Sequence, residues 1–533
     1  FLSAGMGVTG ANALIAQSGS IMLVTNEGNG QLTASLPPLH VAIVGVEKIV
    51  PDIATAITQL RLLARSATGQ SISTYTTFIT GPAPGHELHI VLLDNGRRQM
   101  AADPDFSAAL RCVRCGACAN VCPSYQVVGG QAFGHIYTGP IGLAGTPFHH
   151  GLQAVAGPQS LCLSCGACES VCPVEIPLPR QIIEVRQRVA AAMPPRWWAR
   201  LALRGFASRR LVGAAARALA LATLPWRRGR FTRLPSLPGI RRQLSWRTPP
   251  AIPLRPARAR SDLRAPRPPL VETDASGRRV TLFLQCITDR LAPEIAVATA
   301  TLLRAAGCQV IVPDGQHCCG LPAFDAGDQR TAARMARQTI ETLEAAGDIV
   351  TPAPSCLAAM LHDYDQVFRD DPAWRERGRR VAERVHDVNA YLSGRARFPD
   401  GALAAGDRSP VAVHRFCQAT NALGRGDAIG AIIARVCDVE VVPLSEAEVC
   451  CGFGGSTSVL APEMSKSVVA RKLANVAATG MRTLVTDNPG CILHLRGAAD
   501  AAGLDLQVLH IAEYLATRLP HARAARESSF ATD

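Results

Sequence analysis

Two nearly identical cysteine runs constrain this chain of 533 residues more than any other feature. The first, CVRCGACANVCP, starts at Cys112, and the second, CLSCGACESVCP, starts at Cys162. In a C-x2-C-x2-C-x3-C-P run, the first three thiolates bind one [4Fe-4S] cluster and the fourth binds the cluster of the other run. The predicted ligand sets are Cys112, Cys115, Cys118 and Cys172 for one cluster, and Cys162, Cys165, Cys168 and Cys122 for the other.

This motif favours iron-sulfur clusters over zinc. Pairs of the form C-x2-C also occur in structural zinc sites, but two matched runs that both end in Cys-Pro are typical of two-cluster ferredoxins. His135, His149 and His150 lie between the runs and are alternative ligands. Because eight thiolates suffice for two clusters, we expect these histidines to be loop or surface residues. Residues 101–190 are predicted to form an α-helical ferredoxin-like module that ends in a helix over Arg180–Ala192.

The use of cysteine indicates a reducing compartment. The 18 cysteines gather in metal-type motifs that include adjacent Cys-Cys pairs, which is not the pattern of a disulfide scaffold. No apolar run reaches the roughly 18 residues of a membrane span. We therefore expect a cytoplasmic protein, and the length predicts about three or four domains.

The net charge of +13 comes from one segment. Residues 193–270 hold 18 arginines, no lysine and one acid, Asp262, whereas the rest of the chain carries 37 basic and 41 acidic residues. A nucleic-acid-binding protein would need a basic face on a recognised module. No nucleic-acid partner is therefore expected.

Residues 191–278 are predicted to be a linker rich in Arg, Pro and Trp. The stretch Trp197–Leu224 has the spacing of one or two amphipathic helices, and the prolines after Pro225 predict extended chain. Two roles remain open. Either the linker packs over the domains that it joins, or its Arg and Trp side chains contact the inner face of the cell membrane.

Residues 1–100 have an α/β pattern. Short apolar runs predict buried strands at Ser20–Thr25, Val41–Val46 and His89–Leu93, and Ile53–Ala64 predicts a helix. The glycines of Gly5–Gly10 match a dinucleotide-binding fingerprint, but no strand precedes them, so we do not expect a nucleotide there. The stretch from Thr25 to Gly30 follows a strand and is either a ligand loop or a simple turn.

These residues carry a resemblance to a known domain. The runs GVTGANALIAQSGSIMLVTNEGNG, RSATGQSISTYTTFITGP and LDNGRR are similar to the C-terminal half of the LUD domain of lactate-utilisation iron-sulfur proteins. In that family the domain leads into a two-cluster ferredoxin module, as it does here. The resemblance implies a CoA-transferase-like α/β fold for residues 1–100. Gln17 stands where the family pattern is expected to have an acid.

Residues 279–533 contain an internal repeat. Cys286, the pair Cys318-Cys319 and Cys356 recur about 130 residues later as Cys417, Cys450-Cys451 and Cys491. Each half has the pattern βαβαβα, with expected strands at Val280–Leu284, Gln309–Val312 and Asp348–Pro352, then at Val411–Arg415, Val439–Val442 and Thr483–Thr486. Every cysteine of the set thus follows the C-terminal end of a strand, where open α/β sheets bind ligands.

The two halves resemble the CCG, or cysteine-rich, domains of heterodisulfide reductases, of glycolate and glycerol-3-phosphate dehydrogenase iron-sulfur subunits, and of a lactate-utilisation partner protein. The matching runs are HCCGLPAFDAGD, PSC, CCGFGG and DNPGC. Two Rossmann-like domains are implied, at 279–397 and 398–533. The heterodisulfide reductase pattern ends in C-x-x-C, but Cys356 and Cys491 lack the last cysteine. Each half therefore offers four thiolates, for an iron-sulfur cluster or for zinc in one half. Cys308 and Cys437 are expected to be buried apolar residues.

Together these resemblances imply an α/β multidomain protein that combines two lactate-utilisation proteins. The implied activity is electron transfer during oxidation of L-lactate, or a related 2-hydroxy acid, to pyruvate or the 2-oxo acid. The alternative is a non-catalytic subunit that accepts electrons from a flavoprotein which oxidises glycolate, D-lactate or glycerol 3-phosphate. The implied partners are other lactate-utilisation subunits or that flavoprotein, a small 2-hydroxy acid, and a quinone or another electron acceptor.

No flavin or nicotinamide site is evident in the sequence, so the reacting centre is expected at the paired cysteines, in the LUD domain or on another subunit. Adjacent thiolates hold a metal with an exchangeable position more readily than a saturated ferredoxin cube does, and substrate chemistry at a metal needs such a position. The predicted catalytic residues are Cys318, Cys319, Cys450 and Cys451. Cys286, Cys356, Cys417 and Cys491 are predicted to complete the metal ligands.

Overall fold

A computed structural model describes residues 1–134, 137–193, 197–235, 245–266, 268–404 and 407–519. The chain forms two compact units, Phe1–Gly116 with Ala144–Gly151, and Ala117–Leu143 with the residues from Leu152 onward. No helix of the described residues is both long and apolar enough to cross a membrane.

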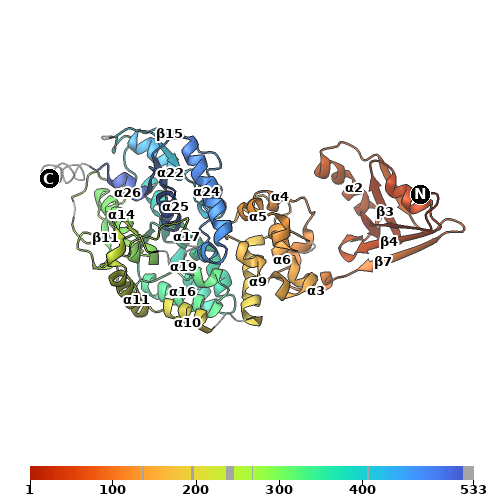
Figure 1. Cartoon of the computed structure of the whole chain (residues 1–533), viewed down its shortest axis with the longest axis horizontal. Helices are drawn as coiled ribbons and strands as arrows, with labels where there is room; N and C mark the ends of the chain where they lie inside the picture. Colours follow the sequence, from red (N-terminus) through yellow and green to blue (C-terminus); the bar gives the residue numbers. More distant parts are fainter. Residues whose placement is uncertain (135–136, 194–196, 236–244, 267, 405–406, 520–533) are drawn as a thin grey trace. The chain divides into compact units, whose positions relative to one another are not determined.

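The first unit contains two sheets (Figure 1). Its elements are β1 (Met6–Thr9), β2 (Ala13–Ile15), β3 (Ser20–Thr25), α1 (Asn29–Ser35), β4 (Leu39–Gly45), η1 (Val46–Lys48), β5 (Ile49–Val50), α2 (Ile53–Thr68), β6 (Tyr75–Ile79), β7 (Glu87–Leu93), α3 (Arg97–Ala102) and η2 (Ser107–Arg111). Strands β1, β4 and β7 are parallel, and the second sheet has the order β5-β2-β3-β6. Ile21 of β3 and Ala42 of β4 belong to one buried cluster, so the two sheets share a core.

The expected strands and helix of residues 1–100 are present as β3, β4, β7 and α2. The prediction that β7 is buried was wrong, because most of its residues are exposed, including Ile90 and Leu92. It lies at the edge of its sheet and pairs only with β4 among the described strands. Gly7 lies within β1, where a Cβ atom would come 1.9 Å from the Thr33 carbonyl oxygen, so this glycine permits close packing of β1 against α1.

The ferredoxin region is helical. Its elements are α4 (Ala117–Asn120), α5 (Pro123–Phe133), α6 (Gly139–His150), α7 (Leu152–Ala156), η3 (Pro158–Leu161), α8 (Ala167–Ser170) and α9 (Leu178–Ala192). Helix α9 is the helix expected at Arg180–Ala192, and Ile182, Ile183 and Val185 on it are buried. The expected helix is therefore confirmed, and it begins two residues earlier, at Leu178.

The cysteine-rich halves form two parallel four-stranded sheets with the orders β11-β10-β12-β13 and β15-β14-β16-β17. The first half contains β10 (Arg279–Leu282), α13 (Cys286–Arg290), α14 (Pro293–Ala305), β11 (Gln309–Ile311), α15 (Leu321–Asp325), α16 (Gln329–Leu343), β12 (Asp348–Thr351), α17 (Pro354–Ala358), η6 (Ala359–Asp363), α18 (Tyr364–Val367), α19 (Pro372–Ala382), β13 (Val385–Asp387) and α20 (Val388–Ser393). The second contains β14 (Val411–Val413), α21 (Cys417–Asn421), α22 (Ala428–Ile432), η7 (Ile433–Cys437), β15 (Val441–Val442), α23 (Thr457–Leu460), α24 (Pro462–Ala478), β16 (Thr483–Thr486), α25 (Pro489–Ala501), β17 (Gln507–His510) and α26 (Ile511–Ala516).

The six strands expected from the repeat are all present, and each sheet gains a fourth strand, β13 or β17, that the sequence analysis missed. The halves share one hydrophobic core, since Leu302 of α14, Val413 of β14 and Leu515 of α26 belong to a single buried cluster. Figure 1 shows α26 beside α14. Cys308 and Cys437 lie in the same cluster, as expected for buried apolar residues.

The linker forms α10 (Trp197–Phe206) and α11 (Arg209–Ala222), the two helices expected for this stretch, then η4 (Leu224–Trp226), β8 (Arg227–Arg228), β9 (Phe231–Thr232) and η5 (Ala257–Ala259). Residues 194–196, 236–244 and 267 lie outside the described part. The described linker packs over the cysteine-rich halves. The Thr248 amide donates to the Gly497 carbonyl at 2.9 Å, and Arg258 pairs with the buried carboxylate of Asp289.

The indole of Trp246 fixes the linker to the second half. Its ring packs edge-on against His494 and is 7% exposed, whereas Trp226 of the same linker is 41% exposed. We expect Trp246→Ala to lower the free energy of unfolding by about 3 kcal/mol, because it leaves a cavity beneath a buried aromatic ring. The matched Trp226→Ala is expected to cost less than about 1 kcal/mol. Thermal denaturation of the two metal-loaded variants tests this, and equal midpoints would show that Trp246 is not an anchor.

Candidate metal centres

The two ferredoxin-type runs adopt the same local backbone. Arg114 and Ser164 have φ angles of 60° and 51°, and Gly116 and Gly166 follow with φ angles of 78° and 81°. These left-handed positions bend the chain tightly between successive cysteines, and glycine adopts them without strain. Each run then enters one short helix turn, α4 or α8, and reaches the cysteine that precedes proline. The sequence match between the runs is thus a match in structure.

The neighbours of Cys122 support crossed ligation, in which the fourth cysteine of each run binds the cluster of the other run. Burial, together with the nearby thiols of Cys165 and Cys162, raises the pKa of the Cys122 thiol to about 12. Burial also raises the pKa of Cys168, with contributions from Cys165, Cys162, Cys122 and Cys118. The fourth cysteine of the first run therefore lies among the three cysteines of the second run. Ligation of a cluster by these four residues stays a prediction.

The histidines between the runs do not gather with these cysteines in the described residues. The Nδ1 atom of His149 lies 2.7 Å from the backbone carbonyl oxygen of Asn95, and His150 is exposed. His135 lies outside the described residues. His149 and His150 both lie at the end of helix α6, so the expected loop position is wrong for them; the expected surface position holds for His150, whereas His149 is half-buried.

The four thiols of the first cysteine-rich half contact one another in the order Cys286, Cys318, Cys319 and Cys356. Cys286 starts α13 after β10, the pair follows β11, and Cys356 lies in α17 after β12. Gly320 has a φ of 101°, and a Cβ atom there would lie 3.0 Å from the Ala332 carbonyl oxygen. Glycine therefore lets the chain turn directly after the cysteine pair.

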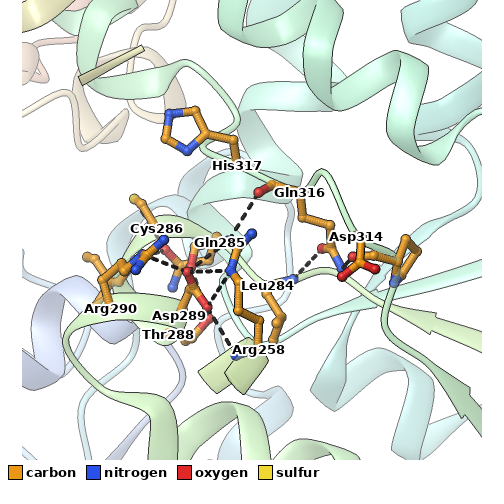
Figure 2. Close-up of polar contacts among 12 residues, drawn as sticks. Arg258, Leu284, Gln285, Cys286, Thr288, Asp289, Arg290, Asp314, Gln316 and His317 are labelled. Atoms are coloured by element: carbon orange, nitrogen blue, oxygen red, sulfur yellow. Dashed lines mark hydrogen bonds and ion pairs between the residues drawn. The ribbon is translucent and has the colours of Figure 1, made fainter. Parts of the chain in front are cut away.

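A polar network holds the segment that contains Cys286 (Figure 2). The Cys286 thiol donates to Gln285 Oε1 at 3.5 Å, and Gln316 Oε1 accepts the Leu284 amide at 2.7 Å. The carboxylate of Asp289 is 1% exposed and pairs with Arg258 at 2.8 Å and with Arg290 at 2.9 Å. A buried carboxylate needs such partners. The network fixes α13 and hence the position of Cys286.

The second half repeats the arrangement, with thiol contacts in the order Cys417, Cys450, Cys451 and Cys491. The Sγ atoms of Cys451 and Cys491 are 3.3 Å apart. The Gly452 amide donates to Cys450 Sγ at 3.4 Å, and Asn488 Nδ2 donates to Cys491 Sγ at 3.7 Å. Amide donors of this kind stabilise thiolate sulfur.

All eight cysteines of the two halves line one cavity of about 130 Å³. The sequence repeat predicts a ligand set in each half, and the structure brings both sets to a common space. Seven of the eight are buried and Cys286 is half-buried. Thiolates in an apolar setting need a cation, and a donor set made of sulfur suits iron-sulfur clusters or zinc. The residues present therefore fit the metal centres that the sequence predicts.

The second ferredoxin run forms part of the same cavity wall, through Leu163 and Ser164. Gln418 donates to the Ser164 carbonyl at 3.0 Å and Asn421 to the Cys165 carbonyl at 2.9 Å. From the first half, Asp325 accepts the Ser164 hydroxyl at 3.0 Å. These contacts join segments more than 150 residues apart, and sequence reasoning missed them because single polar residues give no signal.

The comparisons with known families match three models along the chain: a LUD domain over residues 1–95, a 4Fe-4S dicluster domain over 108–176, and a cysteine-rich domain over 280–361 and 411–496. Lactate utilization protein A of Bacillus cytotoxicus is 35% identical over 240 residues, which are 45% of this chain and 99% of that protein. The proteins of the same name from two Bacillus cereus strains match at the same identity and coverage. The chain belongs to the lactate utilization protein A family. It also carries the LUD and dicluster domains, so the multidomain iron-sulfur architecture expected from the sequence is confirmed.

Crossed ligation has a direct test in the two cysteines that precede proline. We expect Cys122→Ser to damage the cluster of Cys162, Cys165 and Cys168, because Cys122 lies among them, and to spare the other cluster. The mirror variant Cys172→Ser should show the reverse. Electron paramagnetic resonance of the two reduced variants distinguishes the clusters. If Cys122→Ser instead removed the cluster of its own run, the assignment would be wrong.

Proposed function

We propose that this chain is an iron-sulfur oxidoreductase component that transfers electrons during the oxidation of L-lactate, or a related 2-hydroxy acid, to the 2-oxo acid. The observation that carries the proposal is the common cavity, whose wall contains both cysteine-rich sets and the second ferredoxin run. Iron-sulfur clusters bound there would supply one-electron redox chemistry. The family membership supports the lactate assignment.

The ligand sets are held together by direct contacts. Thr457 of the second half donates to the Cys162 carbonyl at 3.1 Å, and Arg186 of α9 donates to the same oxygen at 2.7 Å. The Cys417 thiol is close enough to that of Cys165 to raise the pKa of Cys165, after the larger effect of burial. The chain therefore keeps a ferredoxin ligand next to a ligand of the cysteine-rich set without relying on a mobile segment.

The paired cysteines are the proposed reactive positions. Cys318, Cys319, Cys450 and Cys451 line the cavity together with Gln285, Gln418 and Asn488. Oxidation of a 2-hydroxy acid releases two electrons and two protons, and the amide side chains offer donors for a small carboxylate. Cys286, Cys356, Cys417 and Cys491 are proposed to complete the metal ligands.

The alternative function, that of a relay subunit which takes electrons from a flavoprotein, is favoured by a second cavity. This cavity of about 460 Å³ is lined by α11 residues such as Leu211 and Val212, by Phe206, and by Cys286 and Ile287. Apart from Arg290, its lining is almost entirely apolar, and it reaches a proposed metal ligand. Such a site suits a lipophilic electron acceptor, for example a quinone, better than a hydroxy acid.

The surface of α11 fits the proposed membrane contact. Arg209, Arg210 and Arg217 are exposed, as are Leu211, Leu219 and Leu221. Arginines attract anionic headgroups and leucines insert between the acyl chains. Contact of this helix with the inner face of the membrane would bring a lipophilic acceptor to the cavity beside Cys286.

The cysteine pair of the second half has a clean functional test. We expect the double variant Cys450→Ser, Cys451→Ser to keep the ferredoxin signals but to lose lactate-dependent reduction of those clusters in the presence of the natural partners. Cys437→Ala, a buried cysteine outside the cavity, is the control and should retain reduction. Retained turnover in the double variant would show that these two residues have only a structural role.

The membrane contact is tested by flotation of the full chain with vesicles of phosphatidylcholine and phosphatidylglycerol. The triple variant Arg209→Gln, Arg210→Gln and Arg217→Gln should float less than the wild type, because each arginine near an anionic surface contributes about 1 kcal/mol. The control removes the charge of three exposed arginines of α19, Arg375, Arg379 and Arg380, and should float normally. Equal flotation of all three proteins would exclude the electrostatic contact.

A further inference from the structure

His414 is a buried histidine, and one of its two ring nitrogens makes a hydrogen bond. The residue follows β14, its backbone amide donates to the Val485 carbonyl at 3.0 Å, and its side chain is completely buried. Its Nδ1 atom lies 3.2 Å from the Ala447 carbonyl oxygen. A carbonyl oxygen can only accept, so Nδ1 carries the proton. This hydrogen bond fixes the tautomer and leaves a lone pair on Nε2.

The Nε2 atom has no hydrogen-bond partner although it is buried. A buried polar atom without a partner is costly, and in a native protein it indicates a missing ligand or a functional constraint. A neutral imidazole that donates its other N–H to a backbone carbonyl is the usual arrangement of a metal-binding histidine.

Two cysteine sulfurs of the second half lie beside this ring. One nitrogen of His414 and the Sγ atoms of Cys451 and Cys491 all lie within 4.8 Å of one another. The two sulfurs are 3.3 Å apart, and ligands of a tetrahedral thiolate-bound metal are about 3.5–3.8 Å apart. Among the described residues, this is the only group of three or more histidine, cysteine and acidic side chains with such spacing.

The first half has no counterpart of this histidine. Counting back from the first cysteine of each set, His414 lies three residues before Cys417, and Phe283 lies three residues before Cys286. Phe283 is also completely buried. The fold therefore accepts a buried ring at this position in both halves, but only the second half offers a nitrogen ligand there.

We infer that His414 is a ligand of the metal centre in the second half, with Nε2 bound alongside the sulfurs of Cys451 and Cys491. The centre of the second half is then a mixed sulfur and nitrogen site, whereas the centre of the first half is bound by sulfur alone. The metal is a borderline ion that accepts both donors, either Zn²⁺ or iron. The inference rests on the proposed function, because it requires that the second cysteine set holds a metal.

Where Nε2 takes the coordination position of one of the four thiolates, a neutral ligand replaces a negative one and the centre carries one negative charge less. In iron-sulfur proteins, histidine in place of cysteine raises the reduction potential. Lys472 adds to this difference, since its buried ammonium group donates to the Ala447 carbonyl beside His414, at 3.4 Å. The two halves of the repeat therefore differ in charge around otherwise matched cysteines, and their centres are not redox equivalents.

The test uses the full chain, purified without oxygen and loaded with iron, sulfide and Zn²⁺. Three variants are compared with the wild type: His414→Phe, which copies the first half; His414→Gln, which keeps a donor to the Ala447 carbonyl; and His494→Gln. His494 is a control because it is also buried in the second half with an unpartnered Nε2 but is not in the group with Cys451 and Cys491.

The readout is the coordination of the metal. If the second half holds zinc, zinc-edge X-ray absorption should require an imidazole shell in the wild type and in His494→Gln, but not in the two His414 variants. If it holds iron, pulsed paramagnetic resonance with ¹⁵N-labelled histidine should show a strongly coupled nitrogen that both His414 variants lose. Residues that only hydrogen-bond a metal ligand contribute about 10- to 100-fold to metal affinity. Loss of a ligand itself should therefore make a chelator remove that metal at least tenfold faster.

Three results would overturn the inference. A metal in the second half with sulfur donors alone, or a nitrogen signal that persists in His414→Phe, would exclude His414 as a ligand while leaving the proposed function intact. Absence of any metal in the second half would refute both the inference and the metal centre that the proposed function assigns there.

Discussion

The proposed electron transfer depends on the hydrogen bonds between the second ferredoxin run and the cysteine-rich halves. Backbone carbonyls of this run accept hydrogen bonds from Gln418, Asn421 and Thr457 of the second half, and Ser164 donates to Asp325 of the first. These bonds are individually worth only about 1 kcal/mol, but they act on a short rigid loop that carries Cys162 and Cys165. The halves cannot change their distance from this loop without breaking several bonds at once. Proximity between the two types of centre is therefore built into the fold.

A second constraint is the desolvation of sulfur. Eight cysteines line one small cavity, and contact with Cys450 together with burial raises the pKa of one of them, Cys417. Negative charge there is stable only beside a cation, so metal binding and the packing of the two halves support each other. The shared hydrophobic core that contains Leu302 and Leu515 holds the cavity wall in place from the outside. The linker adds to this wall through Trp246 and Arg258.

Spacing made the cysteine sets predictable, and the strands β10, β12, β14 and β16 were located because they are largely buried and rich in apolar and β-branched residues. The fourth strands β13 and β17 escaped prediction because they lie after the last cysteine of each set, where no motif marks a strand, and because they include polar residues such as Asp387 and His510. The burial of β7 was predicted wrongly because an apolar run does not reveal whether its strand lies at a sheet edge. His414 was missed for a different reason. A single histidine after an apolar strand has no signature, and only the structure shows its unpartnered nitrogen beside two sulfurs.

The central claim is that the cysteine-rich halves hold metal in addition to the two ferredoxin clusters, within one cavity. Counting iron, zinc and acid-labile sulfide in the full chain after anaerobic purification tests this claim most directly. Two [4Fe-4S] clusters account for about eight iron atoms per chain. We expect metal beyond this number, and the excess should disappear when Cys318, Cys319, Cys450 and Cys451 are replaced by serine. About eight iron atoms, no zinc and no change in the quadruple variant would contradict it.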